Sequence, residues 1–219
     1  MSVVAGEKAR DIELVAGLRS LGLSLSNDVC AKLDAYVALL AKWNRTYNLT
    51  AIREPARMVT HHLLDALAVL PHLPQRAIQR VLDVGAGAGV PGIPLAIARP
   101  QWNIVLVDSN HKKVAFVTQA TIELSLPNVR AIATRVEDLS AETPFDVVIS
   151  RAFADLRTFA QLSERHVAPG GHLYAMKGVL PEEEMAALPP SIEVVATPAL
   201  RVPGVDGERH LIVMRVAGA

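Results

Sequence analysis

The hydrophobic positions of this 219-residue chain follow one period at the start and another after about residue 80. In the first part, apolar residues recur three or four positions apart, as on the buried face of a helix. One such stripe consists of Val29, Leu33, Tyr36, Val37, Leu40 and Trp43. It predicts a helix capped by Ser26 or Asn27. We expect an earlier helix that ends near Gly22, and a third that runs from Pro55 to before Pro71.

After residue 80, short β-branched runs alternate with segments of helical length. The expected strands are 80–84, 103–108, 129–134, 145–150 and 171–177, and the expected helices are 90–99, 110–125 and 155–167. This alternation predicts an α/β fold with a parallel sheet between two layers of helices. Two last runs, 192–197 and 209–216, predict a hairpin-like end to the sheet. We therefore expect a helical cap over 1–75 and a sheet-bearing domain over 76–219, which together form one structural unit.

Composition narrows the class of protein. A hydrophobic fraction of 51% with 20% charged residues is typical of a globular chain. The formal net charge of zero counts against a protein that coats long stretches of nucleic acid. Cys30 is the single cysteine, which excludes an internal disulfide and a multi-cysteine zinc site, and we expect no metal site. No apolar run approaches the roughly 20 residues that span a bilayer, and the N-terminus lacks a signal-peptide layout, so we expect a cytoplasmic protein.

The densest chemical signal is the segment VLDVGAGAGVPGIPLAIARP at residues 81–100. An apolar strand leads into closely spaced glycines, which permit a sharp turn and a close approach of the backbone to a ligand. Gly87, Gly89 and Gly92 match the dinucleotide pattern G-x-G-x-x-G, and Asp108 follows about 20 residues later, as a ribose-binding acid does. A dinucleotide is therefore one candidate ligand.

A second interpretation of this segment includes Asp83, which precedes the glycines. Together with Gly85, Gly87 and Gly89 it forms the D-x-G-x-G-x-G pattern typical of S-adenosylmethionine-dependent methyltransferases. An acid there complements a cationic ligand, either directly or through water and loop amides. Pro91 and Pro94 remove N–H donors that a pyrophosphate would need at the helix start. No second nucleotide-binding half follows in the chain, so the methyl donor is favoured.

Three further positions lie where strands are expected to end, at the ligand edge of such a sheet. Asp108 closes the second strand, where its carboxylate can bind both ribose hydroxyls of the donor. The stretch that contains Val136 and Glu137 follows the third strand, near the expected place of an adenine. Arg151 ends the fourth strand and is expected to point into the cleft where substrate meets the methyl donor.

Two kinds of base methylation lack their usual residues. No Asn-Pro-Pro-Tyr-like motif follows the fourth strand, which argues against methylation of the exocyclic amine of adenine. Cys30 lies on the N-terminal helix, so no thiol is placed for covalent attack on cytosine.

Several motifs, in order along nearly the whole chain, resemble the bacterial RsmG family, also called GidB. They are WNRTYNLT (43–50), HHLLDAL (61–67), LDVGAGAGVPGIPLAIARP (82–100), the RVED stretch, VISRAFA (148–154), YAMKG (174–178) and the terminal ERHLIVM. The resemblance departs at Ala66, where the family often has serine. It implies a Rossmann-like, mostly parallel seven-stranded sheet with an antiparallel last strand and an N-terminal helical cap.

The resemblance also implies an activity. A monomeric enzyme would use S-adenosylmethionine to methylate N7 of a guanine in small-subunit (16S) ribosomal RNA, near the decoding site. Donor-binding positions would be Gly85, Val90, the Val136–Glu137 pair and Arg151. Guanine N7 carries a free lone pair and no proton, so its attack needs alignment rather than a general base. Arg151 would hold the guanine at O6 or bind a phosphate.

Other polar residues are ambiguous. His61 and His62 point about 100° apart on a helix, so the two rings do not suit one metal ion. We interpret His62 with Asp65 as a packing or helix–loop hydrogen-bond element. A role in positioning cofactor or RNA is the alternative. The candidate RNA contacts are Lys42, Arg45, Arg53, Arg57, Lys112, Lys113, Lys177 and Arg209. Two other functions stay open, a small-molecule methyltransferase and a non-catalytic cofactor-sensing module that binds the ribosome. The first would have an enclosed apolar pocket, and the second would bind the cofactor without turnover.

Overall fold

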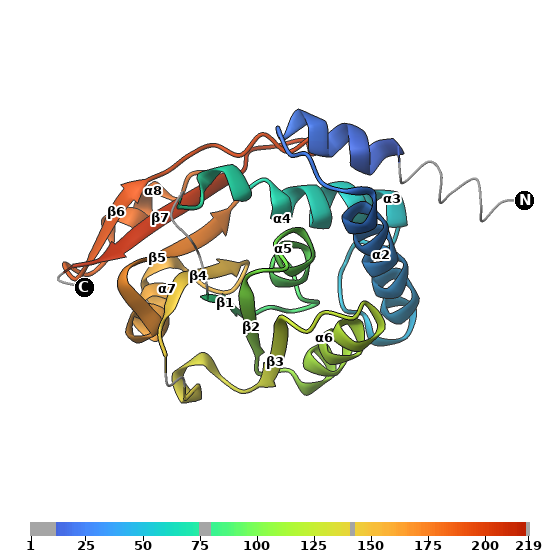
Figure 1. The fold of residues 1–219 in the computed structure, drawn as a ribbon. Coiled ribbons are helices and arrows are strands. Elements are labelled where there is room, and N and C mark those ends of the chain that lie inside the picture. The colour runs from blue at the N-terminus through green and yellow to red at the C-terminus, as the bar shows by residue number, and fades with distance from the viewer. Residues whose placement is uncertain (1–11, 75–79, 141–142, 218–219) are drawn as a thin grey trace, which may run out of the picture.

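A single sheet of seven strands organises the protein. Figure 1 shows its arrangement in a computed structural model. The structure describes residues 12–74, 80–140 and 143–217. The strands are β1 (Arg80–Val84), β2 (Asn103–Asp108), β3 (Val129–Ala133), β4 (Phe145–Arg151), β5 (Val167–Lys177), β6 (Ile192–Ala196) and β7 (His210–Val216). Their order is β3-β2-β1-β4-β5-β7-β6. The first five strands are parallel, and β7 runs antiparallel to both β5 and β6.

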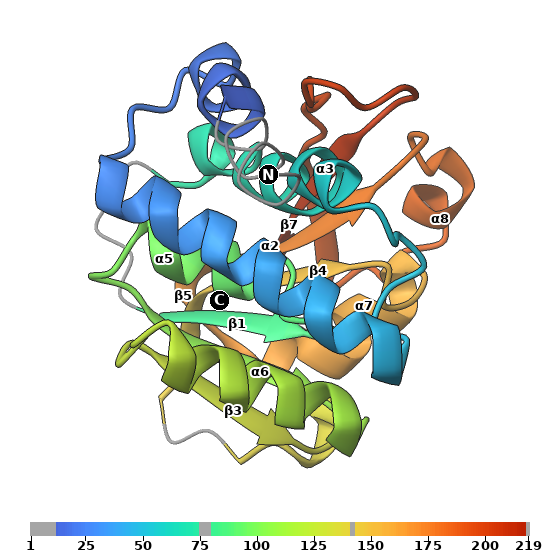
Figure 2. The ribbon, with the colours of Figure 1, turned by 90° about the vertical axis from the view of Figure 1, so that its right-hand side faces the viewer.

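Helices cover both faces of this sheet (Figure 2). They are α2 (Asn27–Tyr47), α3 (Pro55–Met58), α4 (Asp65–Leu67), α5 (Gly92–Ala98), α6 (His111–Glu123), α7 (Leu156–Ser163) and α8 (Glu182–Ala186). Alternate residues of β1 face opposite sides, as the pleat of a strand requires. Val81 joins the core beneath α2, α4, α5 and α6, whereas Leu82 and Val84 join the core beneath α7.

The N-terminal part is helical, as its periodicity predicts. Residues 12–20 form one helix, and α2 follows with Ser26 as its N-cap, whose hydroxyl accepts from the backbone N–H of Val29 at 3.4 Å. The third helix starts at Pro55 as expected, but its middle is a π-helical segment, η1 (Val59–Leu64). The chain also passes Pro71 in a 3-10 turn, η2 (Leu70–His72), rather than ending its helical course before it.

The strand predictions are confirmed, with small shifts at the ends. β1 and β2 match the expected bounds, whereas β5 begins four residues earlier than expected, at Val167. The last two runs form the expected antiparallel pair, with β7 inserted between β5 and β6. The short helix α8 has no expected counterpart. The proposed boundary between cap and sheet domain falls within residues 75–79, outside the described residues, so that division stays a prediction.

The described residues set two further bounds on the class of protein. No helix among them is long and apolar enough to cross a membrane. Within the same residues, no group of three or more histidine, cysteine or acidic side chains is arranged to hold a metal ion.

We predict that cap and sheet unfold as one unit, because Leu33 and Tyr36 of α2 share a core with Val81 of β1 and Ile93 of α5. With Trp102 replaced by phenylalanine, Trp43 of α2 remains as the single tryptophan reporter. Its fluorescence and the far-ultraviolet circular dichroism should then give the same urea midpoint. If the Trp43 fluorescence changed at a lower urea concentration than the circular dichroism, the cap would unfold on its own.

Candidate functional site

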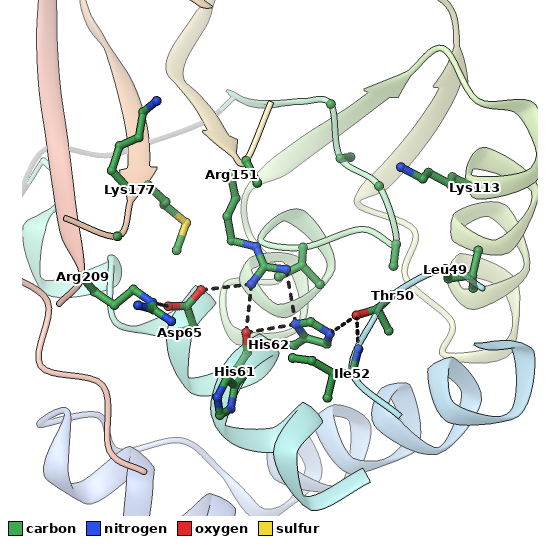
Figure 3. A pocket seen from close by; sticks show the side chains of 18 of the residues that line it. Leu49, Thr50, Ile52, His61, His62, Asp65, Lys113, Arg151, Lys177 and Arg209 are labelled. Carbon is green, nitrogen blue, oxygen red and sulfur yellow. Dashed lines mark hydrogen bonds and ion pairs between the residues drawn. The ribbon is translucent and has the colours of Figure 1, made fainter. Parts of the chain in front are cut away.

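Two cavities meet at the carboxyl ends of β1, β2 and β4, where the strand order reverses and where α/β sheets bind their ligands. The larger has a volume of about 630 Å³, and Figure 3 shows the side chains that line it. The smaller has a volume of about 290 Å³. Gly85, Lys113 and Ala152 line both, so the two cavities are neighbouring parts of one site.

The glycine loop separates β1 from α5 and forms part of the wall of the site. The backbone N–H groups of Gly85 and Ala86 both donate to the carbonyl of Val107, at 2.9 and 3.1 Å, which anchors the loop on β2. Gly85 and Gly87 have φ values of +67° and +59°, in the region that favours glycine. A Cβ on Gly85 would also lie 2.4 Å from the ring of Phe153. Glycine at position 85 is therefore required both by the backbone and by its neighbour.

Asp83 lies beneath this loop, fully buried, and is absent from the described lining of both cavities. Its Oδ2 accepts from the backbone N–H of Gly92 at 2.8 Å. Burial raises the pKa of this carboxyl to about 7, against the lowering effect of the Gly92 hydrogen bond. The sequence left open whether Asp83 contacts a cationic ligand directly or acts on it through backbone amides. The geometry favours the second, because the carboxylate binds a backbone N–H and does not reach either cavity.

The start of α5 does not suit a pyrophosphate. The N–H of Gly92 is bound by Asp83, and that of Ile93 donates to the carbonyl of Gly89 at 2.7 Å. Pro91 and Pro94 have no N–H. The donors that dinucleotide-binding helices present to phosphate are thus used within the protein or missing.

Asp108 stands at the end of β2 and lines the smaller cavity. Its Oδ2 accepts from the N–H of Gly87 at 2.8 Å, and its Oδ1 accepts from the N–H of Asn110 at 2.8 Å. A carboxylate has about four lone-pair positions, so acceptor capacity remains for the hydroxyls of a ribose. The carboxylate therefore links the glycine loop to the place where a nucleoside would lie.

Val136 and Glu137 line the same cavity from the short 3-10 turn η3 (Val136–Asp138). The carbonyl of Val136 lies 3.1 Å from Nε2 of His166, and Arg165 donates to the carbonyls of both Val136 and Glu137. Burial lowers the pKa of His166, which favours the neutral ring, and Nε of Arg165 lies 3.3 Å from the same Nε2. These bonds hold the turn in place beside Asp108.

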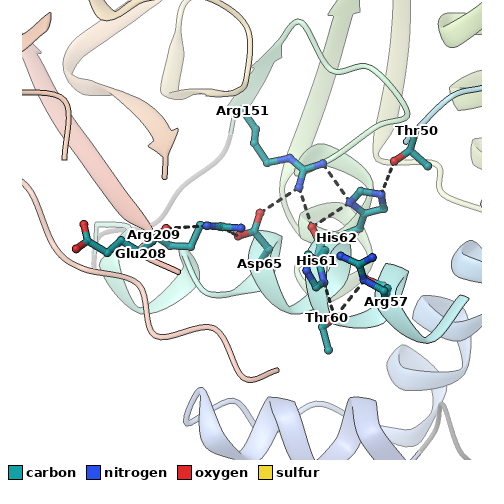
Figure 4. A network of polar contacts seen from close by, with 9 residues as sticks. All are labelled: Thr50, Arg57, Thr60, His61, His62, Asp65, Arg151, Glu208 and Arg209. Carbon is teal, nitrogen blue, oxygen red and sulfur yellow. Dashed lines mark hydrogen bonds and ion pairs between the residues drawn. The ribbon is translucent and has the colours of Figure 1, made fainter. Parts of the chain in front are cut away.

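Arg151 points from the end of β4 to the cap helix rather than freely into the cleft (Figure 4). Its Nη1 donates to the carbonyl of His61 at 2.9 Å and to Oδ2 of Asp65 at 3.0 Å. Its Nη2 lies 3.3 Å from Nδ1 of His62. Both terminal nitrogens thus have protein partners, and Nε together with the second N–H of Nη2 is the edge that remains for a guanine or phosphate.

His62 completes this network. Burial, followed by the positive charge of Arg151, lowers its pKa to about 4, so the ring is neutral at pH 7. Its Nδ1 lies 3.0 Å from the carbonyl of His61 and 3.3 Å from Nη2 of Arg151, and its Nε2 lies 2.9 Å from the hydroxyl of Thr50. This bond between helix and loop matches the structural interpretation of His62.

Asp65 joins a second arginine to the same network. Nε of Arg209, just before β7, lies 3.3 Å from Oδ1 of Asp65. The Asp65 side chain is 6% exposed, so both guanidinium groups neutralise a buried charge. The sequence did not indicate this pairing, because the three residues are distant along the chain and no short-range motif relates them.

Among the predicted RNA contacts, Lys113, Lys177 and Arg209 line the larger cavity, whereas Lys112 does not. The others outside its described lining are Lys42, Arg45, Arg53 and Arg57. Lys177 donates to Glu184 at 2.7 Å and to the carbonyl of Ala154 at 3.0 Å. Asp65 pairs with Arg151 and Arg209 in the lining of this cavity, and Lys113 and Lys177 line it as well.

The mostly parallel sheet with antiparallel β7, the glycine loop without phosphate-binding amides and the carboxylate at the end of β2 are typical of the S-adenosylmethionine-dependent methyltransferase class. A family model described as GidB, rRNA small subunit methyltransferase G, matches residues 29–212. The chain therefore belongs to this family of methyltransferases, whose methyl donor is S-adenosylmethionine.

Relatives from two bacteria carry the name ribosomal RNA small subunit methyltransferase G. The protein of Laribacter hongkongensis (strain HLHK9) is 52% identical over 200 residues, which cover 91% of this chain and 95% of that protein. The protein of Azoarcus sp. (strain BH72) is 52% identical over 201 residues, which cover 92% and 94%.

Solved structures support the fold alone. TrmN from Thermus thermophilus matches with a TM-score of 0.56 at 20% identity, over 69% of this chain and 48% of that chain. The glycopeptide N-methyltransferase MtfA matches with a TM-score of 0.57 at 11% identity, over 71% of this chain and 91% of that chain. The Rossmann-like methyltransferase fold expected from the sequence is confirmed.

We predict that Asp108→Ala weakens binding of S-adenosylhomocysteine by about 10- to 100-fold, since a charged acceptor is lost together with its hold on the Gly87 amide. Calorimetry measures the change, and thermal unfolding confirms that the variant is folded. Asp138→Ala, an exposed acid in the neighbouring turn, is the control. Unchanged affinity in Asp108→Ala would contradict the ribose assignment.

Asp83 should make stability depend on pH. Its folded-state pKa of about 7 lies above its usual value of 3.8, so the folded protein binds this proton more tightly than the unfolded chain does. Its stabilising contribution is therefore full at low pH and is lost as the pH rises toward 7, at up to about 1.4 kcal/mol per pH unit. Asp83→Asn keeps an acceptor for Gly92 and cannot ionise. Urea unfolding between pH 5 and 8 should show the wild type losing stability relative to this variant, and parallel profiles would contradict the shift.

Proposed function

We propose that the enzyme transfers the methyl group of S-adenosylmethionine to N7 of a guanine in small-subunit (16S) ribosomal RNA, near the decoding site. Membership of the rRNA small subunit methyltransferase G family supports the RNA substrate. The observation that carries the proposal is the basic lining of the larger cavity, where Lys113, Arg151, Lys177 and Arg209 occur with Asp65 as the one carboxylate of the described lining.

This distribution of charge suits a nucleic acid even though the whole chain is neutral. Net charge describes long-range attraction, whereas a local excess of cations binds the phosphates next to one target base. Asp65 is paired with two arginines and offers little repulsion to a phosphate. A small-molecule enzyme would instead have an enclosed apolar pocket, which these basic residues do not form.

The proposed donor site uses both cavities. Asp108 binds the ribose, and Val136 and Glu137 flank the adenine in the smaller cavity. The loop residues Gly85, Gly87 and Val90 line the larger cavity and lie along the methionine part. Asp83 and Gly89 support this loop from beneath, by the Gly92 and Ile93 hydrogen bonds, and do not touch the donor. When bound, the donor supplies a methyl group on a positively charged sulfur.

The chemistry at guanine N7 fits the residues around the cavity. N7 has a lone pair and no proton, so the enzyme needs to align the base and exclude competing poses rather than remove a proton. His62 is neutral and both its nitrogens are bound within the protein, so it is not free to act as a base. We propose that Arg151 acts as a positioning residue that fixes the wall of the site, with any base or phosphate contact left to its remaining edge.

The proposal includes a monomer that works in the cytoplasm. Size-exclusion chromatography with light scattering tests the monomeric state.

A non-catalytic cofactor sensor is the alternative from a different class of function, and it would bind the methyl donor without turnover.

The direct test is incubation with tritiated S-adenosylmethionine and small subunits that lack the modification, followed by nuclease digestion and chromatography. Label in N7-methylguanosine at one site of 16S rRNA is expected. Label in another nucleoside, or in low-molecular-weight compounds alone, would contradict the proposal. Donor binding without any transfer would favour the sensor.

Lys113 provides a matched pair of variants. Lys113→Ala should raise the KM for the subunit about 3- to 10-fold and reduce its dependence on salt, because one phosphate contact is lost. Lys112→Ala, its exposed neighbour outside the described cavity lining, should change neither. Equal effects of the two substitutions would show that general surface charge, rather than this cavity, binds the RNA.

A further inference from the structure

The hydroxyl of Tyr36, on the cap helix α2, reaches the glycine loop. It donates a hydrogen bond of 2.7 Å to the backbone carbonyl of Ala88, 52 positions further along the chain. Tyr36 is fully buried, and α2 itself contributes no residue to the described lining of either cavity. Helix α2 packs across α5 and α6 (Figure 2), so the bond connects a helix outside the site with a loop inside it.

The tyrosine has little freedom to move. Its ring lies 6.3 Å from that of Phe116 on α6, which in turn packs edge-on against Trp43 at 5.6 Å. Burial raises the pKa of the Tyr36 phenol well above its usual value, so the hydroxyl stays protonated and remains a donor at any physiological pH. The aromatic contacts therefore hold a permanent donor at one fixed place.

The accepting carbonyl lies where the loop is otherwise held on both sides. Before it, the N–H of Gly87 is bound to Asp108, and after it the N–H of Gly89 donates to the carbonyl of Ala86 at 2.7 Å. A Cβ on Gly89 would lie 2.6 Å from Ile93, so this end of the loop is packed tightly against α5. In the described part of the chain, Tyr36 is the donor that the structure gives to the Ala88 carbonyl, which sets the orientation of the next peptide group.

We infer that Tyr36 is a positioning residue for the methyl donor, which holds the glycine loop in its binding shape and thereby makes the affinity for the donor depend on helix α2. The bond acts on Ala88, next to Gly87, and both line the larger cavity. Without the tyrosine hydroxyl, the buried carbonyl of Ala88 would lack a hydrogen-bond donor, and loop conformations that expose this carbonyl would become more populated. A larger population of such conformations lowers the fraction of the protein that can bind the methyl donor. The inference concerns donor binding and does not depend on the identity of the methylated RNA.

Tyr36→Phe tests it by removing one oxygen atom. The dissociation constant for S-adenosylhomocysteine, measured by calorimetry, should rise about five- to tenfold. The KM for the donor should rise in parallel, while kcat at saturating donor stays within about twofold, since a filled site has the same loop shape. The control is Tyr47→Phe on the same helix, whose side chain is half exposed and which should bind as the wild type does. A folded Tyr36→Phe protein with unchanged affinity would overturn the inference.

A second measurement needs no substitution. Because coupling between two parts of a protein is reciprocal, donor binding should stabilise the helix that stabilises the loop. Amide hydrogen exchange of the wild type should therefore slow around Tyr36 in α2 when S-adenosylhomocysteine is added, although the ligand site lies outside this helix. The distant helix α8 should show no change. Protection of residues 85–90 without any change in α2 would overturn the inference, and neither experiment depends on RNA methylation.

Discussion

The buried carboxylate of Asp65 is the constraint on which the arrangement of the site depends. It pairs with Arg151 from the end of β4 and with Arg209 from just before β7, two positions that meet only in the folded protein. A buried charge is costly without partners, and the two arginines supply them, so removal of either one leaves Asp65 with a single partner. The trio therefore holds the cap helix above the ligand edge of the sheet and builds one wall of the larger cavity.

A second polar link acts on the other side of the same cavity. Tyr36 reaches the glycine loop from α2, as Asp65 reaches β4 from the following helix. Between them, the cap contributes His61, His62 and Asp65 to the lining while the sheet contributes the glycine loop and Arg151. The N-terminal helical part thus forms part of the wall of the larger cavity and not merely a cover for the apolar face of the sheet.

Much of the fold follows from periodicity. β1 and β2 are short apolar runs bounded by polar or glycine residues, and their bounds were predicted within a residue. Helix α5 begins at Gly92, two residues later than predicted, and the N–H of Gly92 donates to Asp83 instead of to the preceding turn. The π-helical segment η1 has no period that distinguishes it from an α-helix, and it places His61 and His62 in the polar network.

The sequence by itself determined which residues gather at the ligand edge, since the carboxyl ends of parallel strands must meet there and the glycine pattern marks the loop. The position of Asp108 at this edge follows from its place at the end of β2 alone. Tertiary structure alone decided which polar groups remain free for a ligand. Asp83 is enclosed under the loop, and the terminal nitrogens of Arg151 are bound to the cap. Burial and partner choice depend on segments distant along the chain, and local spacing carries no information about them.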